Sequence, residues 1–531
     1  MGMSEPGGFE KRGGNNVTPE EASAIIGELQ NANLNLQNAN CQLTATVEEL
    51  RQQLDWFKRQ LFGQKSERFV DPDPDAPLLP GFEEAPAPPE PEKETVNYER
   101  RKHRNQSGWQ KLPDDLPREE VIIKLPEEER FGPDGQELKL IGYDVFERLA
   151  WRNSYFVKVF KREKYADPND ATFGVVTAPH PGDPLDGKSG KSKFDASFIA
   201  QMITEKCLDY LPLYRQQERL ARVGIDVHRS TLCRLFGGTA DLLTPLYERH
   251  VELILECEII HADESSMKML APGTGKCQTA WLWCRMTGIG PPLTAFAFDL
   301  SRSGESAKKY LGEYQGTVIA DQYDAYIQCE NDEECSLDLA GCWAHARRYF
   351  EKALPVHQEE AGKLLKMIQQ LYMVERQAKE QAAERGTEKA LFECRQKLRA
   401  KVSRDIVDRI FRECDGLKLN DEPSSFICKA ANYALNAQTR LRRFLSNPKI
   451  NIDNNPAENA IRPIALGRKN YLFAGNETGG QNLAMLLSLL VTCKQNKKNP
   501  QAWLEDVLNR ILTTPAREID SLLPHLWQPT E

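Results

Sequence analysis

The sequence lacks three features that would place the protein in a membrane or outside the cell. It has no run of about 18 apolar residues, the length that a membrane-spanning helix needs. It has no basic-then-apolar leader, so we expect no signal peptide. Its 13 cysteines are odd in number and include no Cys-x-x-Cys pair, a pattern that fits free thiols better than a disulfide framework. The sequence therefore predicts a cytoplasmic protein without membrane partners.

Positive net charge is also lacking, since the formal net charge is -9 at pH 7. Taken alone, this balance argues weakly against a nucleic-acid-binding protein. The acidic residues, however, are concentrated in a Pro-rich linker at 71–98, and a basic run at 100–104 follows it. Such a run is either a solvated face or a contact for DNA phosphates. The net charge therefore does not exclude DNA as a partner.

Cysteine is absent from a long interval, between Cys41 and Cys207. Within this interval, residues 119–178 alternate apolar and polar side chains over short spans, which predicts a small β-rich module. Because the module has no cysteine, a cysteine-type zinc site is excluded there.

The N-terminal part of the chain carries a heptad pattern. Leucines recur every seven residues, at Leu29, Leu36, Leu43 and Leu50. A second row, three residues earlier, includes Asn33 and Asn40, and a buried Asn at such positions fixes the register of a parallel dimer. The pattern predicts a homodimeric coiled coil over residues 21–70. The alternative is a single amphipathic helix that packs on its own domain.

Helical periodicity returns after a turn-rich segment at 179–193. Residues 213–223, Gly224 and residues 227–236 have the spacing of a helix, a tight turn and a second helix. This spacing resembles a helix-turn-helix, whose second helix enters the major groove of DNA, although any pair of antiparallel helices can show it. The candidate DNA contacts on the second helix are Arg229 and Arg234.

From residue 257 the pattern changes to that of an α/β domain. Short apolar segments predict strands at 258–261, 280–286, 293–300 and 317–320. Residues 351–445 are highly charged, have helical periodicity and contain few strand formers, so they predict an all-α insertion.

Two aspartates share one context in this region. Asp263 and Asp321 each follow a predicted apolar strand, where side chains project from a sheet edge into a crevice. Two such carboxylates, with a third from a helix, can hold two Mg²⁺ ions about 4 Å apart. Glu458, near a predicted helix start, is the natural third ligand. The alternative is that each Asp is a turn residue or a helix cap.

Neighbouring acids offer other choices for these roles, namely Glu264, Asp324 and Asp453. His261 lies beside Asp263 and is also consistent with a structural histidine. Cys335, Cys342 and His345 suggest a zinc site, but their spacing is irregular and a fourth ligand is not evident.

The predicted helix start belongs to an unusual stretch at 451–475. Asn455 suits an N-cap and Pro456 suits the first helical position. Glu458 would then occupy the third position, where a carboxylate completes a capping box. Arg462 follows one helical turn later on the same face.

Five ordered strings together resemble the transposases of the IS66 family of bacterial insertion sequences. They are LFGQKSE at 61–67, HADES at 261–265, ADQYDAY at 320–326, CWAHARRYF at 342–350 and NNPAENAIRP…GRKNYLFAG at 454–475. The resemblance covers the chain from about residue 25 to residue 513. It implies a DDE transposase with a ribonuclease-H-like fold, an N-terminal leucine zipper and a helical insertion before the last acid.

The resemblance assigns roles residue by residue. Asp263, Asp321 and Glu458 match the first, second and third catalytic acids, and Cys342 and His345 match a Cys-x-x-His signature that shapes the site or contacts DNA. The basic residues that we expect to hold DNA are Arg347, Arg348, Arg462, Arg468 and Lys469. The family commonly carries a cysteine-type zinc finger after the zipper, and this chain departs from it there.

The expected fold is multidomain, with an α/β ribonuclease-H-like catalytic domain interrupted by the all-α insertion. The predicted units are 1–20 (disordered), 21–70 (coiled coil), 71–98 (acidic linker), 99–178 (basic patch and β-rich module), 179–250 (helical DNA-binding region), 251–350 and 451–480 (catalytic core), 351–450 (all-α insertion) and 481–531 (C-terminal helices). The predicted function is Mg²⁺-dependent transposition, with Mn²⁺ as a substitute cofactor. The predicted partners are element-end and target DNA, a second copy of the chain, and accessory proteins of the element. The alternatives are an inactive DNA-binding regulator and a related metal-dependent nuclease.

Overall fold

The computed structural model describes residues 112–529, except for 133–134, 170–173, 188–191, 272, 333–334, 336 and 421. The predicted coiled coil, acidic linker and basic run lie outside the described residues. The chain divides into two compact units, Met1–Arg101 with Glu351–Gly362, and Lys102–Phe350 with Lys363–Glu531. Both β-sheets and all the site residues lie in the second unit.

A four-stranded sheet forms where the sequence alternates apolar and polar residues. It consists of β1 (Arg118–Ile123), β2 (Lys139–Trp151), β3 (Tyr155–Ala166) and β4 (Val175–Thr177). The strand β3 is central, since it pairs in parallel with β1 and antiparallel with β2 and β4. Phe146 of β2 stacks on Phe160 of β3, with ring centroids 4.8 Å apart. The prediction that this region forms strands is confirmed.

Three helices follow this sheet, α2 (Ala196–Cys207), α3 (Leu213–Arg222) and α4 (Arg229–Leu255). Gly224 turns the chain between α3 and α4 with a φ of +75°, a conformation that glycine adopts without steric strain. The helix α4 begins two residues later than predicted and runs well past residue 236. Its apolar stripe continues through Leu243 and Leu246 into the core, and this burial extends the helix.

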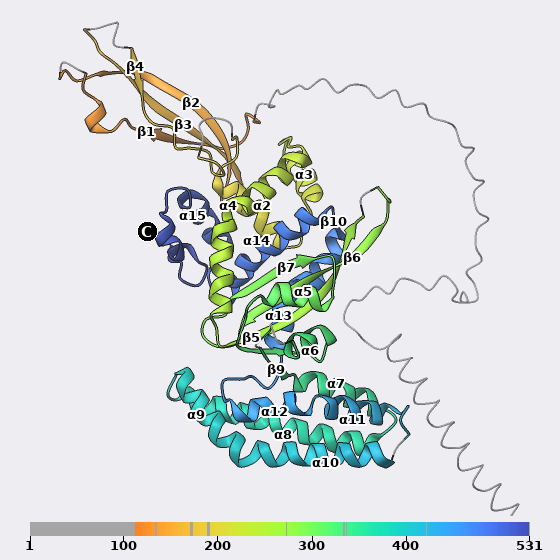
Figure 1. Cartoon of the computed structure of the whole chain (residues 1–531). Coiled ribbons are helices and arrows are strands. Elements are labelled where there is room, and N and C mark those ends of the chain that lie inside the picture. The colour runs from red at the N-terminus through yellow and green to blue at the C-terminus, as the bar shows by residue number, and fades with distance from the viewer. Residues whose placement is uncertain are drawn as a thin grey trace, which may run out of the picture. The chain divides into compact units, whose positions relative to one another are not determined.

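The larger sheet has the strand order β7-β6-β5-β8-β9, with β10 beside the far end of β5 (Figure 1). Its strands are β5 (Ile259–Leu270), β6 (Cys277–Thr287), β7 (Thr294–Asp299), β8 (Thr317–Ala320), β9 (Asp338–Gly341) and β10 (Phe473–Ala474). Strands β5, β6 and β7 are antiparallel, whereas β8, β9 and β10 continue the sheet in parallel.

Helices cover both faces of the larger sheet. On one face, α5 (Gly304–Leu311) and α6 (Asp324–Glu330) share a buried cluster with Ile260, Ala262 and Trp283. On the other face, α13 (Asn455–Tyr471) and α14 (Glu477–Gln495) pack with α4 against Leu282 and Cys284. The chain ends in α15 (Pro500–Arg510) and a 3₁₀ turn, η3 (Ala516–Leu522).

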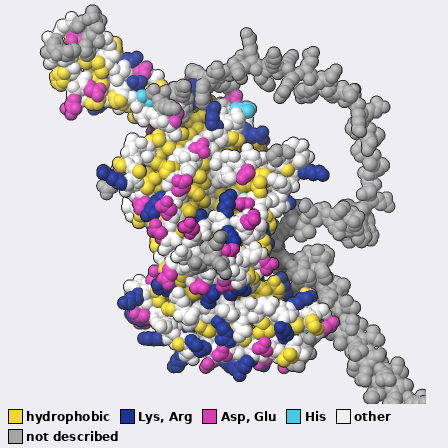
Figure 2. All heavy atoms as spheres, in the orientation of Figure 1, with side chains coloured by type: hydrophobic (Ala, Val, Ile, Leu, Met, Phe, Trp, Pro, Cys, Tyr) yellow, Lys and Arg dark blue, Asp and Glu magenta, His cyan; other side chains and the backbone are white. Residues whose placement is uncertain are grey.

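The predicted all-α stretch is helical in the described residues. Its helices are α8 (Gln358–Ala383), α9 (Glu388–Leu398), α10 (Arg404–Asn420), α11 (Phe426–Asn436) and α12 (Gln438–Ser446), and α7 (Trp343–Ala353) begins before the predicted start at residue 351 and leads into them. Glu375 is buried there between Arg395 and Arg399, at 3.0 and 2.7 Å. Basic and acidic side chains are interspersed over the outer surface of these helices (Figure 2). Within the part of the chain described here, no helix is long and apolar enough to cross a membrane.

Candidate active site

Asp263 lies inside the strand β5 and not after its end, so the predicted strand at 258–261 was too short. The strand continues to Leu270 because β6 pairs with it along its whole length, and Asp263 lies opposite Cys284. Successive side chains in a strand point to opposite faces. Asp263 therefore shares its face with Met267, on the side of the sheet that α13 covers.

Glu264, the neighbouring acid, points to the other face and has its own partners. Its side chain is only 2% exposed. It accepts a hydrogen bond from the Tyr326 hydroxyl at 2.7 Å and one from Arg302 Nε at 2.9 Å. Burial raises the pKa of Glu264, and these two donors oppose the rise. Glu264 is thus a paired structural carboxylate on the side of α6.

Asp321 directly follows β8, as the sequence predicted. Its Oδ1 accepts a hydrogen bond from the Tyr323 backbone N–H at 3.0 Å, which turns the chain toward α6. The second carboxylate oxygen forms none of the hydrogen bonds found in this structure among the described residues. Asp321 lies close enough to Asp263 for its charge to raise the pKa of that acid.

The predicted cap of α13 is wrong in two respects. The helix begins at Asn455, so the residue before it is Asn454, and the Asn454 side chain does not cap the helix. Asn455 is exposed and contacts Asp453 instead. Glu458 consequently occupies the fourth helical position, where a capping box cannot form.

Asn454 instead joins the start of α13 to β5. Its side-chain Nδ2 donates to the Ala262 carbonyl at 2.7 Å, and its Oδ1 lies 2.8 Å from His261 Nδ1. The other ring nitrogen of His261 accepts from Asn451 Nδ2 at 3.0 Å. His261 Nδ1 therefore carries the proton and donates to Asn454. These three side chains form a polar clamp between strand and helix.

His261 serves this clamp in its neutral form. It is completely buried, and burial lowers its pKa to about 4. Because both ring nitrogens have partners, the structural interpretation of His261 is confirmed. Asn451 and Asn454 were not predicted from the sequence to have this role. The only local signal is a pair of asparagines three residues apart before Pro456.

Glu458 lies beside α7. Its carboxylate accepts a hydrogen bond from Arg348. Its Oε1 lies 3.7 Å from His345 Nδ1, and neither atom has a hydrogen-bond partner although both are buried. Ligand atoms of Cys342, His345 and Glu458 lie within 4.8 Å of one another. These atoms form a set of ligands that a cation could bind.

Cys342, directly before α7, contacts the start of α13. Its Sγ accepts a hydrogen bond from the Asn454 backbone N–H at 3.2 Å, and burial raises its pKa to about 12. Cys342 therefore remains a thiol at neutral pH. Burial also lowers the pKa of His345, against the attraction of Asp321 and Glu458 for its proton.

Burial and neighbouring negative charges both raise the pKa of Asp263. Burial raises its pKa to about 7, and the negative charges of Glu264, Asp321 and Glu458 add to the rise. The Glu264 backbone N–H, which donates to Asp263 Oδ1 at 2.9 Å, opposes it. Carboxylates that repel one another in a crevice favour either a shared proton or a bound cation.

The predicted DNA-contacting residues of α7 and α13 differ in how exposed they are. Arg347, Arg462 and Lys469 are exposed, and the Arg348 side chain is 46% exposed while it contacts Glu458. Arg468 is engaged with β5, because it donates to the Ser266 carbonyl at 2.8 Å.

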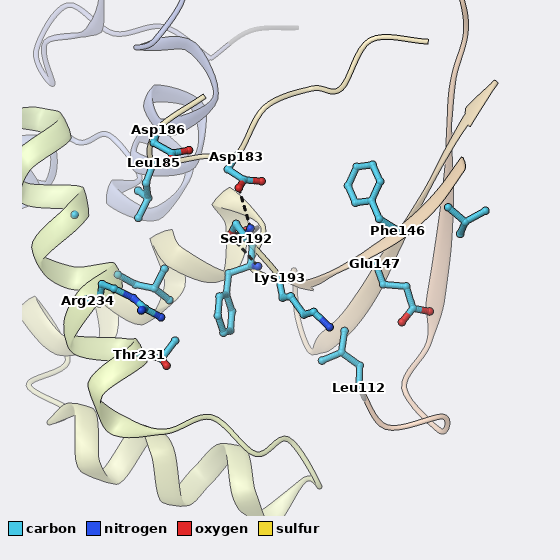
Figure 3. Close-up of a pocket in the computed structure, with 14 residues that line it drawn as sticks. Leu112, Phe146, Glu147, Asp183, Leu185, Asp186, Ser192, Lys193, Thr231 and Arg234 are labelled. Atoms are coloured by element: carbon cyan, nitrogen blue, oxygen red, sulfur yellow. Dashed lines mark hydrogen bonds between the residues drawn. The ribbon is translucent and has the colours of Figure 1, made fainter. Parts of the chain in front are cut away.

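Arg229 and Arg234 lie on a separate element, the first turns of α4, and both are exposed. Arg234 and Thr231 line a cavity of about 830 Å³. They lie on one side of it, and Phe146 and Glu147 of β2 lie on the other (Figure 3). The site residues predicted from the sequence are thus divided between the three acids with their α7 neighbours and the start of α4.

Comparison with known proteins connects these features to a family. The family model described as "Transposase IS66 family" matches residues 191–482. The models "Transposase C of IS166 homeodomain" and "IS66 C-terminal element" match residues 49–121 and 488–525.

Two similar relatives come from Sinorhizobium fredii (strain NBRC 101917 / NGR234). Uncharacterized protein y4jD is 31% identical over 508 residues, which cover 92% of this chain and 96% of the relative. Uncharacterized protein y4qI is 33% identical over 409 residues, which cover 74% of this chain and 73% of the relative. With a family model that spans more than half of its length, the chain belongs to the IS66 family of transposases.

Proposed function

We propose that this protein is a DDE transposase that cleaves and joins DNA at the ends of an insertion sequence. The observation that carries the proposal is the placement of three carboxylates on elements that pack together, in the middle of β5 (Asp263), directly after the neighbouring strand β8 (Asp321) and in the first turns of α13 (Glu458). Electrostatic coupling of Asp263 to both other acids supports their assignment to one site.

A ribonuclease-H-like core is part of this proposal. The strand order β7-β6-β5-β8-β9, with three antiparallel strands followed by two parallel ones, supports it. The all-α insertion between β9 and α13 accounts for the long interval in sequence between Asp321 and Glu458. The polar clamp supports the proposal as well, since it fixes Glu458 relative to the strand that carries Asp263.

The three acids fit divalent cations. Mg²⁺ prefers carboxylate oxygens and retains waters for its substrate, and Mn²⁺ accepts the same ligands. The raised pKa of Asp263 and the buried Glu458 Oε1 without a partner are features that a cation would satisfy. Asp263, Asp321 and Glu458 would hold the ions. When bound, two ions activate the attacking hydroxyl and stabilise the leaving 3′-oxygen.

The reaction proceeds in two in-line displacements. In the first, a water oxygen bonds to the scissile phosphorus, the bond to the 3′-oxygen breaks, and that oxygen leaves as a 3′-hydroxyl. In the second, this 3′-hydroxyl attacks a phosphodiester of target DNA and displaces its 3′-oxygen. The carboxylates orient the reacting groups, and Arg348, beside Glu458 and partly exposed, is placed to hold a phosphate.

Other parts of the chain would bind the DNA. The exposed Arg347 of α7 and Arg462 and Lys469 of α13 are candidates, whereas Arg229 and Arg234 are candidates for base or phosphate contacts from α4. Arg468 would stabilise β5 by its hydrogen bond to the Ser266 carbonyl. We further propose a homodimer through residues 21–70, cytoplasmic location, and accessory proteins of the same element as partners.

The test is cleavage and strand transfer by the full-length protein, on duplexes that carry the terminal repeats of its element. Wild-type protein should release a 3′-hydroxyl and join it to target DNA only when Mg²⁺ or Mn²⁺ is present. Asp263→Asn should lose both activities, whereas Glu264→Gln, on the other face of β5, should retain them.

Each alternative has its own outcome in the same assay. Sequence-specific binding without metal-dependent cleavage would identify an inactive regulator. Cleavage without a joined product would identify a nuclease. Intact strand transfer by Asp263→Asn would refute the catalytic assignment.

A further inference from the structure

A second cavity lies on the Asp263 face of β5, and none of the three candidate catalytic acids lines it. Its volume is about 430 Å³, within the range of about 300–1,000 Å³ that small-molecule sites occupy. Elements far apart in sequence enclose it, namely α2, the start of α3, α4, the end of α13, β10 and the start of α14. Its lining includes Phe236, Met267, Tyr471 and Phe473. The cavity thus lies between α4, which carries the candidate DNA contacts Arg229 and Arg234, and β5, which carries Asp263.

Lys206 supplies the positive charge of this cavity. Its ammonium lies 5.2 Å from the centroid of the Phe236 ring and 5.4 Å from that of the Tyr471 ring. Within the described part of the chain, no carboxylate forms an ion pair with Lys206. Burial lowers its pKa, and the groups that oppose this are the thiols of Cys207 and Cys233. A lysine held between two rings without an acidic partner is suited to an anionic ligand.

The N-terminus of α14 lies at the same cavity. Asn476, Thr478 and Gly479 line it, and Asn476 caps the 19-residue helix by accepting from the Gly479 N–H at 2.7 Å. The positive end of a helix dipole favours phosphate groups. Lys206 and the helix terminus come from different parts of the chain, and both therefore favour a negatively charged ligand.

Phe473 adds an exposed aromatic surface to this charge. It is 41% exposed, although it belongs to β10 and lines the cavity. The preceding residue, Leu472, has a φ of +61°, which is rare for a residue with a side chain. Nucleic-acid-binding proteins use such aromatic faces to stack unpaired bases.

We propose that this cavity holds one nucleotide of the element-end DNA, displaced from its duplex, with its phosphate at Lys206 and the α14 N-terminus and its base on Phe473. This inference rests on the proposed function. Met267, which lines the cavity, is four residues from Asp263 along β5, or about 13 Å at 3.3 Å per residue. That distance corresponds to about four nucleotides of one B-DNA strand. The held nucleotide therefore lies a few positions from the scissile phosphate and fixes the end of the element relative to the acids.

The decisive variant fills the cavity without disturbing its walls. Gly475 lines the cavity, and a Cβ added there would meet no other atom within 4 Å. Gly475→Leu should therefore fold normally and occupy the space of the nucleotide. Gly416→Leu is the matched control, because a Cβ at Gly416 in α10 also meets no atom within 4 Å.

The probe is a duplex of the terminal repeat of the protein's own element with its flanking DNA. 2-Aminopurine replaces each nucleotide in turn within about six positions of the cleavage point. Its fluorescence rises when the base leaves the helical stack, and EDTA prevents cleavage during the measurement. Full-length wild-type protein and Gly416→Leu should brighten one position several-fold, whereas Gly475→Leu should not. Lys206→Met should weaken end-DNA binding about tenfold, with the same far-UV circular dichroism as wild type.

The outcomes separate this inference from the proposed function. If wild-type protein cleaves the ends in Mg²⁺ but no position brightens, or if Gly475→Leu brightens the same position, the nucleotide site is refuted and the transposase assignment stands. If wild-type protein neither binds nor cleaves the ends, the proposed function fails, and the nucleotide site fails with it.

Discussion

Replacing Asp263 by asparagine should stabilise the folded protein while it abolishes catalysis. The structure raises the pKa of Asp263 from 3.8 to about 7, chiefly through burial. At 1.36 kcal/mol per pKa unit, ionising Asp263 at pH 8 disfavours the folded state by up to about 4 kcal/mol. The side chain is partly exposed and solvent screens it, so we expect about half of this value. Asparagine removes the charge and keeps an oxygen to accept the Glu264 N–H.

The effect should depend on pH with a definite sign. Between pH 3.8 and about 7, the folded state holds a proton on Asp263 that the unfolded state has lost. The free energy of unfolding of the wild type therefore falls as the pH rises through this window, and the loss is complete above it. The gain from Asp263→Asn should be about 2 kcal/mol at pH 8 and close to zero below pH 4.

Urea unfolding of wild type and variant at several pH values, without divalent cations, measures this difference. Asp324→Asn is the control, because Asp324 is an exposed acid at the start of α6, and it should change stability by less than about 1 kcal/mol. Saturating Mg²⁺ should reverse the order, since a ligand at 100 times its Kd adds about 2.7 kcal/mol to the wild type. Two results would refute the electrostatic reasoning. One is an Asp263→Asn variant that is less stable than wild type at pH 8. The other is a variant whose free energy of unfolding differs from that of wild type as much at pH 4 as at pH 8.

Three other predictions concern separate parts of the chain. Asn454→Ala should lower the free energy of unfolding by about 2–4 kcal/mol, because it leaves buried partners unsatisfied, whereas Asn455→Ala should change it by less than about 1 kcal/mol in the same urea titration. Glu375→Gln should destabilise the all-α insertion by about 3–5 kcal/mol, since two buried arginines lose their counter-charge, and faster proteolysis within the insertion would report it. Charged residues in place of Leu36 and Leu43 should give monomers in sedimentation experiments; a persistent dimer would place the interface outside the zipper.

The sequence indicated many elements of the fold because burial leaves a periodic pattern. The apolar segment at 317–320 matches β8 to the residue, and Asp321 follows it as expected. The helical periodicity that returns after residue 193 corresponds to α2, in which Phe198 and Met202 are buried. Strand and helix periods distinguish such segments without any knowledge of their neighbours.

Other features could not be read from a local pattern. The polar second half of β5 does not look like a strand, yet pairing with β6 keeps it extended, and Asp263 lies inside it. Local sequence also left Glu264 as an alternative to Asp263, which the family resemblance favoured. The opposite faces of one strand separate them, and Arg302 and Tyr326 donate hydrogen bonds to Glu264 and not to Asp263.

By itself, the sequence determined the family, through ordered motifs whose residues are all present, and the approximate position of most strands and helices. Only the tertiary structure decided what individual side chains do within those motifs. The sequence predicted a cap at Asn455, but the residue before α13 is Asn454, which joins the helix to a histidine 193 residues away. Glu458 resembled a capping-box carboxylate, but it faces Arg348 and His345. The physical reason is that propensity and periodicity act over a few residues, whereas hydrogen-bond partners and desolvation depend on whatever segment the fold brings alongside.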